Sequence, residues 1–437
     1  MQVSGKHFLI LGLAKSGMGA IQLLRSQGAI LTGADNRNLA DLPDVQKLVD
    51  NSEISFTPDR HASLDGIDAL IVSPGIPLTH PITQAAYHRG LPVIGEIELA
   101  TEFLRGPVIA ITGSNGKTTT TSLVGHILKS ANVPAQVGGN IGFAASDMIP
   151  TSNFMQWNVL ELSSFQLETV NEFRAEIASV LNVTPNHLDR HGTFDVYAAA
   201  KGNIFRNQRS GDWAVLNAAN PTSAAFAKTT SARKAYFCGV EAHKSGDEIE
   251  LFGRPLMPVS AVPLPGQHNL ENVMAAATIC HLAGAPHQAI ADAITTFQGV
   301  RHRLEFIREV RGIKFYNDSK ATSVDATLKA VEALPGPLWV ILGGLDKGSS
   351  YLPLANALRA KAKAVLLIGS AAHMIEKELK DHIPLDLCGT LETAIHSALN
   401  QAKPGDTVLL APACASYDQF KSYEHRGDSF RQLVEQI

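Results

Sequence analysis

Short apolar runs separated by amphipathic stretches mark the first third of the chain. Phe8–Leu11, Ile30–Ala34 and Ala69–Val72 are mostly apolar, and each is followed by glycine or polar residues. Continuous apolar runs of this length predict strands buried on both faces, as in a parallel sheet. Met18–Gln27 predicts the first helix, and a short strand near Pro92–Ile94 closes this unit.

The same alternation runs through the rest of the chain and restarts after Gly299. Further strands are predicted at Val108–Thr112, Asn158–Glu161, Ile177–Asn182, Trp213–Asn217, Phe315–Asp318, Leu338–Gly343, Ala364–Ile368 and Thr407–Ala411. Phe194–Arg206 and Asn269–Ala283 predict helices, and Arg233–Pro265 predicts short strands and turns. We therefore expect an α/β fold with three domains in series, over residues 1–94, 95–299 and 300–437.

The length of the chain agrees with this division, and its charge and cysteine content disfavour several classes of function. The 437 residues suit about three domains, and a net charge of -4 does not favour binding to nucleic acid or to an anionic membrane. The four cysteines are far apart and include no Cys-x-x-Cys pair, so we expect reduced thiols in a cytoplasmic protein. No segment is apolar enough to predict membrane insertion, and the run Phe8–Ala14 is too short for a signal peptide.

A glycine-rich segment joins the predicted strand Val108–Thr112 to a helix. Glycines let the backbone approach phosphate groups, and the helix N-terminus attracts anions. Lys117 is placed to reach the β- and γ-phosphates, and the Thr118 hydroxyl is placed to bind Mg²⁺. The segment is shorter than the usual phosphate loop, because Ile111 stands where its first glycine would fall. The candidate ATP-binding residues here are Gly113, Ser114, Asn115, Gly116, Lys117, Thr118 and Thr119.

The N-terminal turn carries a weaker signal. Gly12 and Gly17, with Asp35 after the second strand, have the spacing of a dinucleotide site, but Ala14 replaces its second glycine. Another nucleotide or anionic ligand that contacts Asp35 or Arg37 is favoured over NAD. Glycines that only form the turn are the remaining alternative.

Several polar residues follow predicted strands of the second domain. Glu161 ends a strand near the phosphate loop and suits Mg²⁺, although a surface acid would occupy the same position. His187 also follows a strand and is either a ligand or a structural histidine. Lys201 lies on a helix, where an exposed lysine is the ordinary expectation. Asn269 and Asn272 share a helix face, so they either meet one ligand or cap the helix.

Charged and hydroxyl residues follow three strands of the last domain. Arg303, at the boundary into this domain, either stabilises a transferring phosphoryl group or forms an interdomain salt bridge. Lys320, Thr322, Lys347 and Ser416 would form a cationic, hydroxyl-rich pocket suited to a carboxylate substrate. Cys414 and His425 lack an orienting residue, which disfavours a thiol protease.

Nine motifs together resemble the Mur ligases of peptidoglycan synthesis, over the whole chain. They are Thr112–Thr119, Gly138–Gly142, Leu160–Leu167, Leu181–Asp189, Tyr197–Lys201, Gly266–Asn272, His302-Arg303, Asn317–Thr322 and Ser416–Gly427. The resemblance implies a Rossmann-like N-terminal domain that binds a UDP-linked substrate and a P-loop-type central ATPase domain. It also implies a Rossmann-like C-terminal domain that binds an amino acid.

The resemblance also implies roles for individual residues. The UDP-linked substrate would contact Ser16, Asp35, Arg37, Gly75, Asn140 and His187. ATP would contact Asn269, Asn272, Arg303 and Asp318 besides the phosphate loop. Two Mg²⁺ ions would be held by Thr118, Glu161, His187 and a carbamate formed from CO2 on Lys201. D-glutamate would contact Lys320, Thr322, Lys347, Ser416 and Tyr423. The catalytic residues would be Lys117, Glu161, His187, Lys201 and Arg303.

The implied reaction is an ATP-dependent amide ligation of D-glutamate to UDP-N-acetylmuramoyl-L-alanine through an acyl phosphate. A monomer in the cytoplasm with only small-molecule substrates is expected. Two positions depart from the family pattern: Tyr423 stands where phenylalanine is expected, and Lys15-Ser16 varies the N-terminal turn. The alternatives are another Mur ligase or a folylpolyglutamate synthase, a nicotinamide-dependent oxidoreductase, and a nucleotide-binding switch without chemistry.

Overall fold

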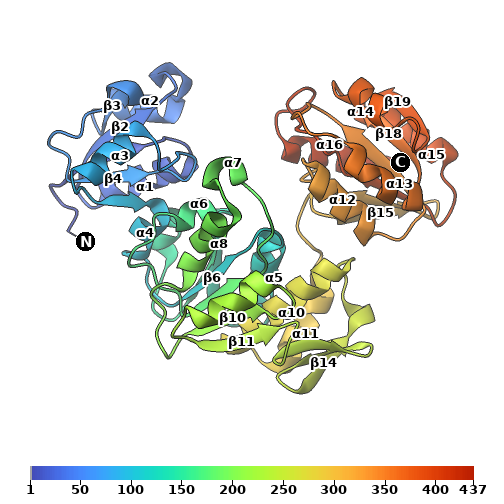
Figure 1. Cartoon of the computed structure of the whole chain (residues 1–437), viewed down its shortest axis with the longest axis horizontal. Helices are drawn as coiled ribbons and strands as arrows, with labels where there is room; N and C mark the ends of the chain where they lie inside the picture. The colour runs from blue at the N-terminus through green and yellow to red at the C-terminus, as the bar shows by residue number, and fades with distance from the viewer. Residues whose placement is uncertain (1) are drawn as a thin grey trace. The chain divides into compact units, whose positions relative to one another are not determined.

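The computed structural model describes residues 2–437 and contains three β-sheets flanked by helices (Figure 1). The first sheet is parallel and has the order β3-β2-β1-β4-β5. Its strands are β1 His7–Leu11, β2 Ile30–Asp35, β3 Ser55–Pro58, β4 Ala69–Val72 and β5 Val93–Gly95. Its helices are α1 Lys15–Ser26, α2 Pro43–Asp50, α3 Pro81–His88 and α4 Glu96–Thr101.

The second sheet has the order β14-β13-β12-β11-β10-β9-β6-β8-β7 and is parallel except at the β12–β14 end. Its strands are β6 Val108–Thr112, β7 Ala135–Gly139, β8 Trp157–Glu161, β9 Ile177–Val180, β10 Trp213–Asn217, β11 Arg233–Phe237, β12 Ala242–Ser245, β13 Glu248–Leu251 and β14 Arg254–Pro258. The helices are α5 Lys117–Ser130, α6 Ser164–Leu167, α7 Leu188–His191, α8 Phe194–Gly202, α9 Pro221–Ala225, α10 Gln267–Leu282 and α11 His287–Thr296.

The third sheet has the order β15-β16-β20-β17-β18-β19, and only the β15–β16 pair is antiparallel. Its strands are β15 Glu305–Val310, β16 Ile313–Asn317, β17 Leu338–Gly343, β18 Ala362–Ile368, β19 Leu385–Gly389 and β20 Thr407–Leu410. Its helices are α12 Val324–Ala333, α13 Ala355–Lys361, α14 Ala372–Leu379, α15 Leu391–Gln401 and α16 Tyr423–Glu435.

Burial on both faces explains the continuous apolar runs. In β1, Phe8 and Ile10 pack in one core cluster, and Leu9 and Leu11 pack in another on the opposite face. Alternate residues of a strand point to opposite faces, so a strand covered on both sides needs apolar residues throughout. The predicted parallel α/β arrangement is confirmed.

Some boundaries differ from the prediction, for physical reasons. Helix α1 begins at Lys15 rather than at Met18, because the glycine turn is shorter than expected. The prediction Phe194–Arg206 divides into α8 and a 3₁₀ turn at Asn203–Phe205. Four strands were not predicted, namely β3, β7, β15 and β19, and each is the edge strand of a sheet.

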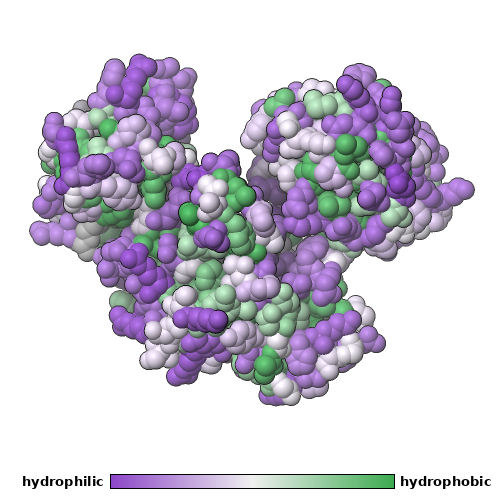
Figure 2. Space-filling model, in the orientation of Figure 1, coloured by the Kyte–Doolittle hydropathy of each residue, from purple (hydrophilic) through white to green (hydrophobic). Residues whose placement is uncertain are grey.

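The described chain forms two compact units. One contains the residues up to Ala261 together with Glu271–Thr295, and the other contains Val262–Leu270 together with Thr296–Ile437. Within residues 2–437, no helix is long and apolar enough to cross a membrane. The face drawn in Figure 2 is mostly hydrophilic, with hydrophobic residues in small separate patches.

Candidate active site

The phosphate loop between β6 and α5 is held by the segment that follows β9. The backbone N–H of Ser114 donates to the Asn182 carbonyl, and the N–H of Asn115 donates to the Asn182 side-chain oxygen, both at 2.9 Å. The Asn182 amide nitrogen donates back to the Asn115 carbonyl at 3.2 Å. The Lys117 ammonium donates to the Gly113 carbonyl at 2.8 Å. These hydrogen bonds fix the shape of the loop, and Asn182 is a residue that the sequence did not single out.

Gly116 adopts a left-handed conformation, with φ of 80°, at the start of α5. A β-carbon built on Gly116 would lie 2.2 Å from the side-chain oxygen of Asn272. The predicted ATP residue Asn272 therefore packs directly on the phosphate loop. The other predicted amide, Asn269, lies within the first turn of α10 and donates to the Pro265 carbonyl at 2.7 Å, so it is not the N-cap.

Glu161 ends β8, which pairs in parallel with β6, so its carboxylate is brought to the edge that carries the phosphate loop. Its side chain is buried, and one oxygen accepts a hydrogen bond from the Asn140 amide at 2.8 Å. The other oxygen is buried without a hydrogen-bond partner among the described residues. A buried, unpaired carboxylate oxygen beside a phosphate loop is chemically suited to a hard cation such as Mg²⁺.

Lys201 is buried, with 1% of its surface exposed, which contradicts the ordinary expectation of an exposed lysine. Its ammonium donates to the Gly113 carbonyl at 2.9 Å and lies 4.8 Å from the centre of the Tyr197 ring. Burial, reinforced by the nearby charge of Lys117, lowers the pKa of Lys201 to about 6. The side chain is therefore a largely neutral amine at neutral pH, directly behind the phosphate loop.

His187 also has a left-handed backbone, with φ of 53°, immediately before the short helix α7. Its ring meets the Phe165 ring edge-on at 5.0 Å and the Tyr197 ring at 6.4 Å. Burial, with the charge of Lys117, lowers the pKa of His187. The Tyr197 hydroxyl lies 2.9 Å from the Ser114 hydroxyl, which joins this aromatic group to the phosphate loop.

A cavity of about 460 Å³ joins the first sheet to the loops of the second. It is lined by Gly12, Leu13, Ala14, Lys15, Ser16, Asp35, Asn36, Arg37, Ser73, Pro74, Gly75, Ile76, Gly139, Asn140 and Gln166. All the residues predicted to hold the UDP-linked substrate except His187 are in this lining. Asn36, Ser73, Ile76 and Gln166 are lining residues that the sequence did not single out.

Asp35 and Arg37 form a two-point ion pair in this cavity, at 2.8 and 2.9 Å. Asp35 also accepts the Leu13 N–H at 2.7 Å. Burial tends to raise the pKa of Asp35, but the bonds from Arg37 and Leu13 outweigh it and lower the pKa to about 2. A β-carbon on Gly17 would lie 2.0 Å from the Gly12 carbonyl oxygen, so helix–strand packing alone requires this glycine. The turn glycines therefore do not favour the oxidoreductase alternative.

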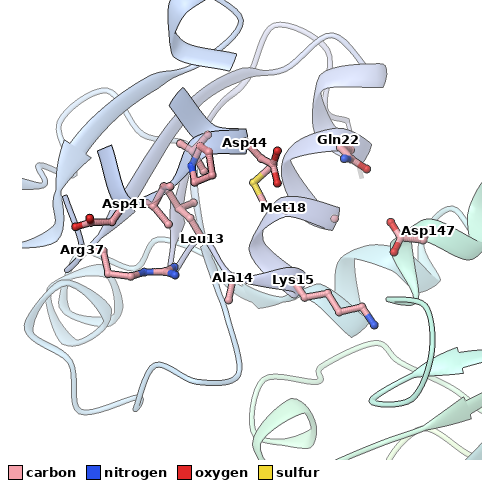
Figure 3. A pocket seen from close by; sticks show the side chains of 13 residues that line it. Leu13, Ala14, Lys15, Met18, Gln22, Arg37, Asp41, Asp44 and Asp147 are labelled. Carbon is pink, nitrogen blue, oxygen red and sulfur yellow. The ribbon is translucent and has the colours of Figure 1, made fainter. Parts of the chain in front are cut away.

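A neighbouring cavity of about 420 Å³ shares Leu13, Ala14, Lys15 and Arg37 with the first one. In Figure 3, Arg37 and Lys15 lie on opposite sides of Ala14, and Lys15 extends toward the segment that carries Asp147. The Lys15 ammonium donates to the Gly142 carbonyl, in the same loop as Asn140. Lys15, which varies the family pattern, thus ties the N-terminal turn to a loop of the second sheet.

Of the residues predicted to bind glutamate, Lys320, Thr322, Lys347 and Ser416 lie on three loops that follow strands of the third sheet, and Tyr423 is the first residue of α16. The Lys320 ammonium lies 3.7 Å from the centre of the Tyr423 ring, and the Lys347 ammonium donates to the Thr322 carbonyl at 3.0 Å. Ser416 is buried, beside Ala415. The aromatic ring at position 423 therefore supports Lys320 through a cation–π contact, which a phenylalanine would also provide.

Arg426 connects two of these loops and was not singled out from the sequence. It is completely buried and donates to the Ser319 hydroxyl at 3.0 Å, to the Ser319 carbonyl at 3.0 Å, and to the carbonyls of Cys414 and Ala415 at 3.2 Å. Burial lowers the pKa of Arg426 to about 10. Burial also raises the pKa of the Cys414 thiol, which disfavours a reactive thiolate.

Arg303 and Asp318 interact near the start of the third sheet. Burial raises the pKa of Asp318 to about 7, against the opposing effects of the Arg303 charge and the Leu304 N–H. No group of three or more His, Cys, Asp or Glu side chains within residues 2–437 is arranged to hold a metal ion.

Three family models match separate parts of the chain. The N-terminal domain of MurD-like Mur ligases matches residues 6–95, the Mur ligase middle domain matches 111–280, and the glutamate ligase domain of Mur ligases matches 302–414. The chain therefore belongs to the Mur ligase family. The family and the three-domain α/β fold predicted from the sequence are both confirmed.

Relatives within the family are similar over nearly their whole length. The UDP-N-acetylmuramoylalanine–D-glutamate ligase of Solibacter usitatus is 51% identical, over 99% of this chain and 98% of the relative. The ligase of the same name from Koribacter versatilis is 46% identical, over 100% and 99%.

Among solved structures, MurF ligase of Thermotoga maritima in complex with ADP matches with a TM-score of 0.64 and 18% identity, over 100% of this chain and 96% of that one. The UDP-N-acetylmuramate-alanine ligase MurC of the same organism matches with a TM-score of 0.61 and 19% identity, over 99% of both chains. At these identities the likeness concerns the fold.

Proposed function

We propose that this chain is an ATP-dependent ligase that joins D-glutamate to UDP-N-acetylmuramoyl-L-alanine during peptidoglycan precursor synthesis. The observation that carries the proposal is the 51% identity, over nearly the whole chain, to a relative with that activity in its name. The phosphate loop, the cavity beside the first sheet and the cationic loops of the third sheet supply the chemistry that such a ligase needs.

Each domain takes one substrate in this proposal. Residues 1–94 bind the UDP-linked substrate, residues 95–299 bind ATP and residues 300–437 bind D-glutamate. Ser16, Asp35, Arg37 and Gly75 contact the UDP portion, whereas Asn140 and His187 contact the muramoyl portion. The lining of the cavity of about 460 Å³ supports all of these except His187, which precedes α7 and is not part of the lining.

The reaction proceeds in two steps. The terminal phosphoryl group of ATP is transferred to the L-alanyl carboxylate, which gives an acyl phosphate and ADP. The amine of D-glutamate then attacks the acyl carbon, and the tetrahedral intermediate expels phosphate and leaves an amide. Lys117 and the backbone N–H groups of the phosphate loop hold the ATP phosphates, with Asn269, Asn272, Arg303 and Asp318 as further ATP contacts. Lys320, Thr322, Lys347, Ser416 and Tyr423 hold the carboxylates of D-glutamate.

Two Mg²⁺ ions fit the residues present. Thr118, Glu161, His187 and a carbamate on Lys201 would hold them, and the unpaired buried oxygen of Glu161 supports this assignment. Bound Mg²⁺ supplies positive charge for phosphoryl transfer. A neutral amine is the form that adds CO2, and a pKa of about 6 gives Lys201 a neutral fraction at pH 7.5 roughly a thousandfold larger than that of an exposed lysine. This depressed pKa supports the carbamate.

The proposal extends to the setting of the enzyme. We expect a monomer in the cytoplasm that takes small-molecule substrates, does not bind nucleic acid and does not insert into a membrane. The net charge of -4 supports the expectation that the protein does not bind nucleic acid.

The first test is phosphate release from ATP and Mg²⁺ with UDP-N-acetylmuramoyl-L-alanine, comparing D-glutamate, L-glutamate and no amine. Release that depends on D-glutamate is expected. Release with L-glutamate alone would keep the ligase mechanism but overturn the assigned glutamate pocket. No release with either amine would contradict the proposed reaction and favour another member of the family.

A further inference from the structure

Arg190 makes three contacts that no predicted catalytic or binding role requires. It lies on the single-turn helix α7, and its side chain is 13% exposed. One guanidinium nitrogen donates to a Glu168 carboxylate oxygen and to the Ile76 carbonyl, both at 2.9 Å. The guanidinium also stacks 4.3 Å from the centre of the Phe165 ring. A planar donor group in three simultaneous contacts is held in one orientation.

Each partner of Arg190 belongs to the surroundings of the substrate cavity or of His187. Ile76 lines that cavity and follows Gly75 in the loop after β4. Phe165 packs edge-on against the His187 ring at 5.0 Å. Glu168 pairs with Arg190 through one oxygen and lies 3.2 Å from the His191 ring nitrogen through the other. One guanidinium therefore links a loop of the first sheet to the turn of the second sheet that begins with His187.

The backbone of His187 needs such support. Its φ of 53° is unfavourable for a residue with a side chain. The His187 carbonyl accepts the N–H groups of Arg190 and His191, at 3.2 and 3.0 Å. Both of those residues are anchored through their side chains to Glu168. The Glu168 carboxylate thus holds Arg190 and His191, the last two residues of the turn that begins at His187.

We infer that Arg190 is a positioning residue: paired with Glu168, it sets His187 against the cavity that receives the UDP-linked substrate. This inference rests on the proposed function. It assigns Arg190 no contact with reacting atoms. Loss of the guanidinium would let the loop at Ile76 and the turn at His187 move independently, so the substrate would be held in the wrong place relative to the phosphate loop.

The test is steady-state kinetics of Arg190→Met in the full chain, with each substrate varied in turn. Misplacement of a bound substrate by about 1 Å costs on the order of 100-fold in rate. We therefore expect kcat/KM for the UDP-linked substrate to fall by about 10- to 100-fold. The KM for D-glutamate should stay near that of the wild type, because the residues proposed to bind it lie on the third sheet.

Arg174→Met is the matched control. Arg174 forms a comparable, partly buried pair with Asp212, with Nε donating at 2.9 Å, and it lines neither the substrate cavity nor the phosphate loop. Both methionine variants should lower the melting temperature to a similar extent, but only Arg190→Met should change kcat/KM for the UDP-linked substrate. Arg190→Lys keeps the charge but not the planar stacking group, so it should recover the melting temperature and leave kcat/KM well below wild type.

Equal kinetics in Arg190→Met and Arg174→Met would overturn the inference, since the pair would then serve stability alone. A rise in all three KM values would also overturn it. Failure of the proposed function gives a different result, because the wild-type chain would then show no turnover with these substrates.

Discussion

Replacing Gly116 with alanine tests whether the shape of the phosphate loop depends on its contact with Asn272. The new methyl group would lie 2.2 Å from the Asn272 oxygen, whereas ordinary contacts of a β-carbon begin at 3.4 Å. The loop or Asn272 must therefore move by roughly 1 Å, a displacement that costs on the order of 100-fold in rate at a catalytic site. The left-handed φ of 80° adds about 1–2 kcal/mol of conformational cost for any residue with a β-carbon.

Gly90→Ala separates these two effects. Gly90 has a φ of 68°, but a β-carbon there would meet nothing within 4 Å. Both variants should lose about 1–2 kcal/mol of unfolding free energy, measured by denaturant titration. Only Gly116→Ala should also lose kcat/KM for ATP, by roughly 100-fold, in a coupled assay of ADP release. If the two variants have kcat/KM for ATP within about twofold of each other, the contact with Asn272 does not shape the nucleotide site.

Three further changes test separate groups. Lys117→Ala should abolish ATP turnover, and normal turnover would remove the phosphate-loop assignment. Lys201→Ala should lose most activity, and bicarbonate should not rescue Lys201→Arg. The wild type exposed to ¹³CO2 should show a carbamate carbon by NMR that Lys201→Ala lacks. Unchanged activity in Lys201→Ala would refute the carbamate. For Asp318, the folded-state pKa of about 7 exceeds the ordinary value of 3.8, so its stabilising contribution is complete below about pH 3.8 and is lost as the pH rises through about 7. The melting temperature of Asp318→Asn minus that of the wild type should therefore increase between pH 5 and pH 8. A decrease in this difference over the same range would contradict the raised pKa.

The interior of the fold was predictable from the sequence, whereas its edges were not. β6, β10 and β17 have the predicted bounds, because strands covered on both faces need unbroken apolar runs. The edge strands β3 and β19 are only partly buried and carry polar residues, so they lack that pattern. Hydrogen bonding to a neighbouring strand defines an edge strand, and a local pattern of residues does not contain that information.

The candidate site shows the same division between local and long-range information. The phosphate loop was predictable because its residues are contiguous. The burial of Lys201 was not predictable from its position in a helix, because it depends on Gly113 and Tyr197, which contact its side-chain nitrogen. Asn182 and Arg426 act on segments far from them in sequence, so only the folded chain reveals what they hold. Both residues lie in motifs that resemble those of the family, but the resemblance implied no role for either residue.

The buried guanidinium of Arg426 has a consequence for ligand binding at the proposed amino-acid pocket. Because it fastens Ser319 to Cys414 and Ala415 by four hydrogen bonds, the loops before Lys320 and Ser416 are ordered in advance. A small dicarboxylate makes few contacts with a protein. Because the two loops are already ordered, its binding free energy is not reduced by the entropy of ordering them. A change in the preferred amino-acid substrate would then come from substituting the side chains that these loops carry. A change in the shape of the loops would instead leave the buried Arg426 cation without hydrogen-bond acceptors.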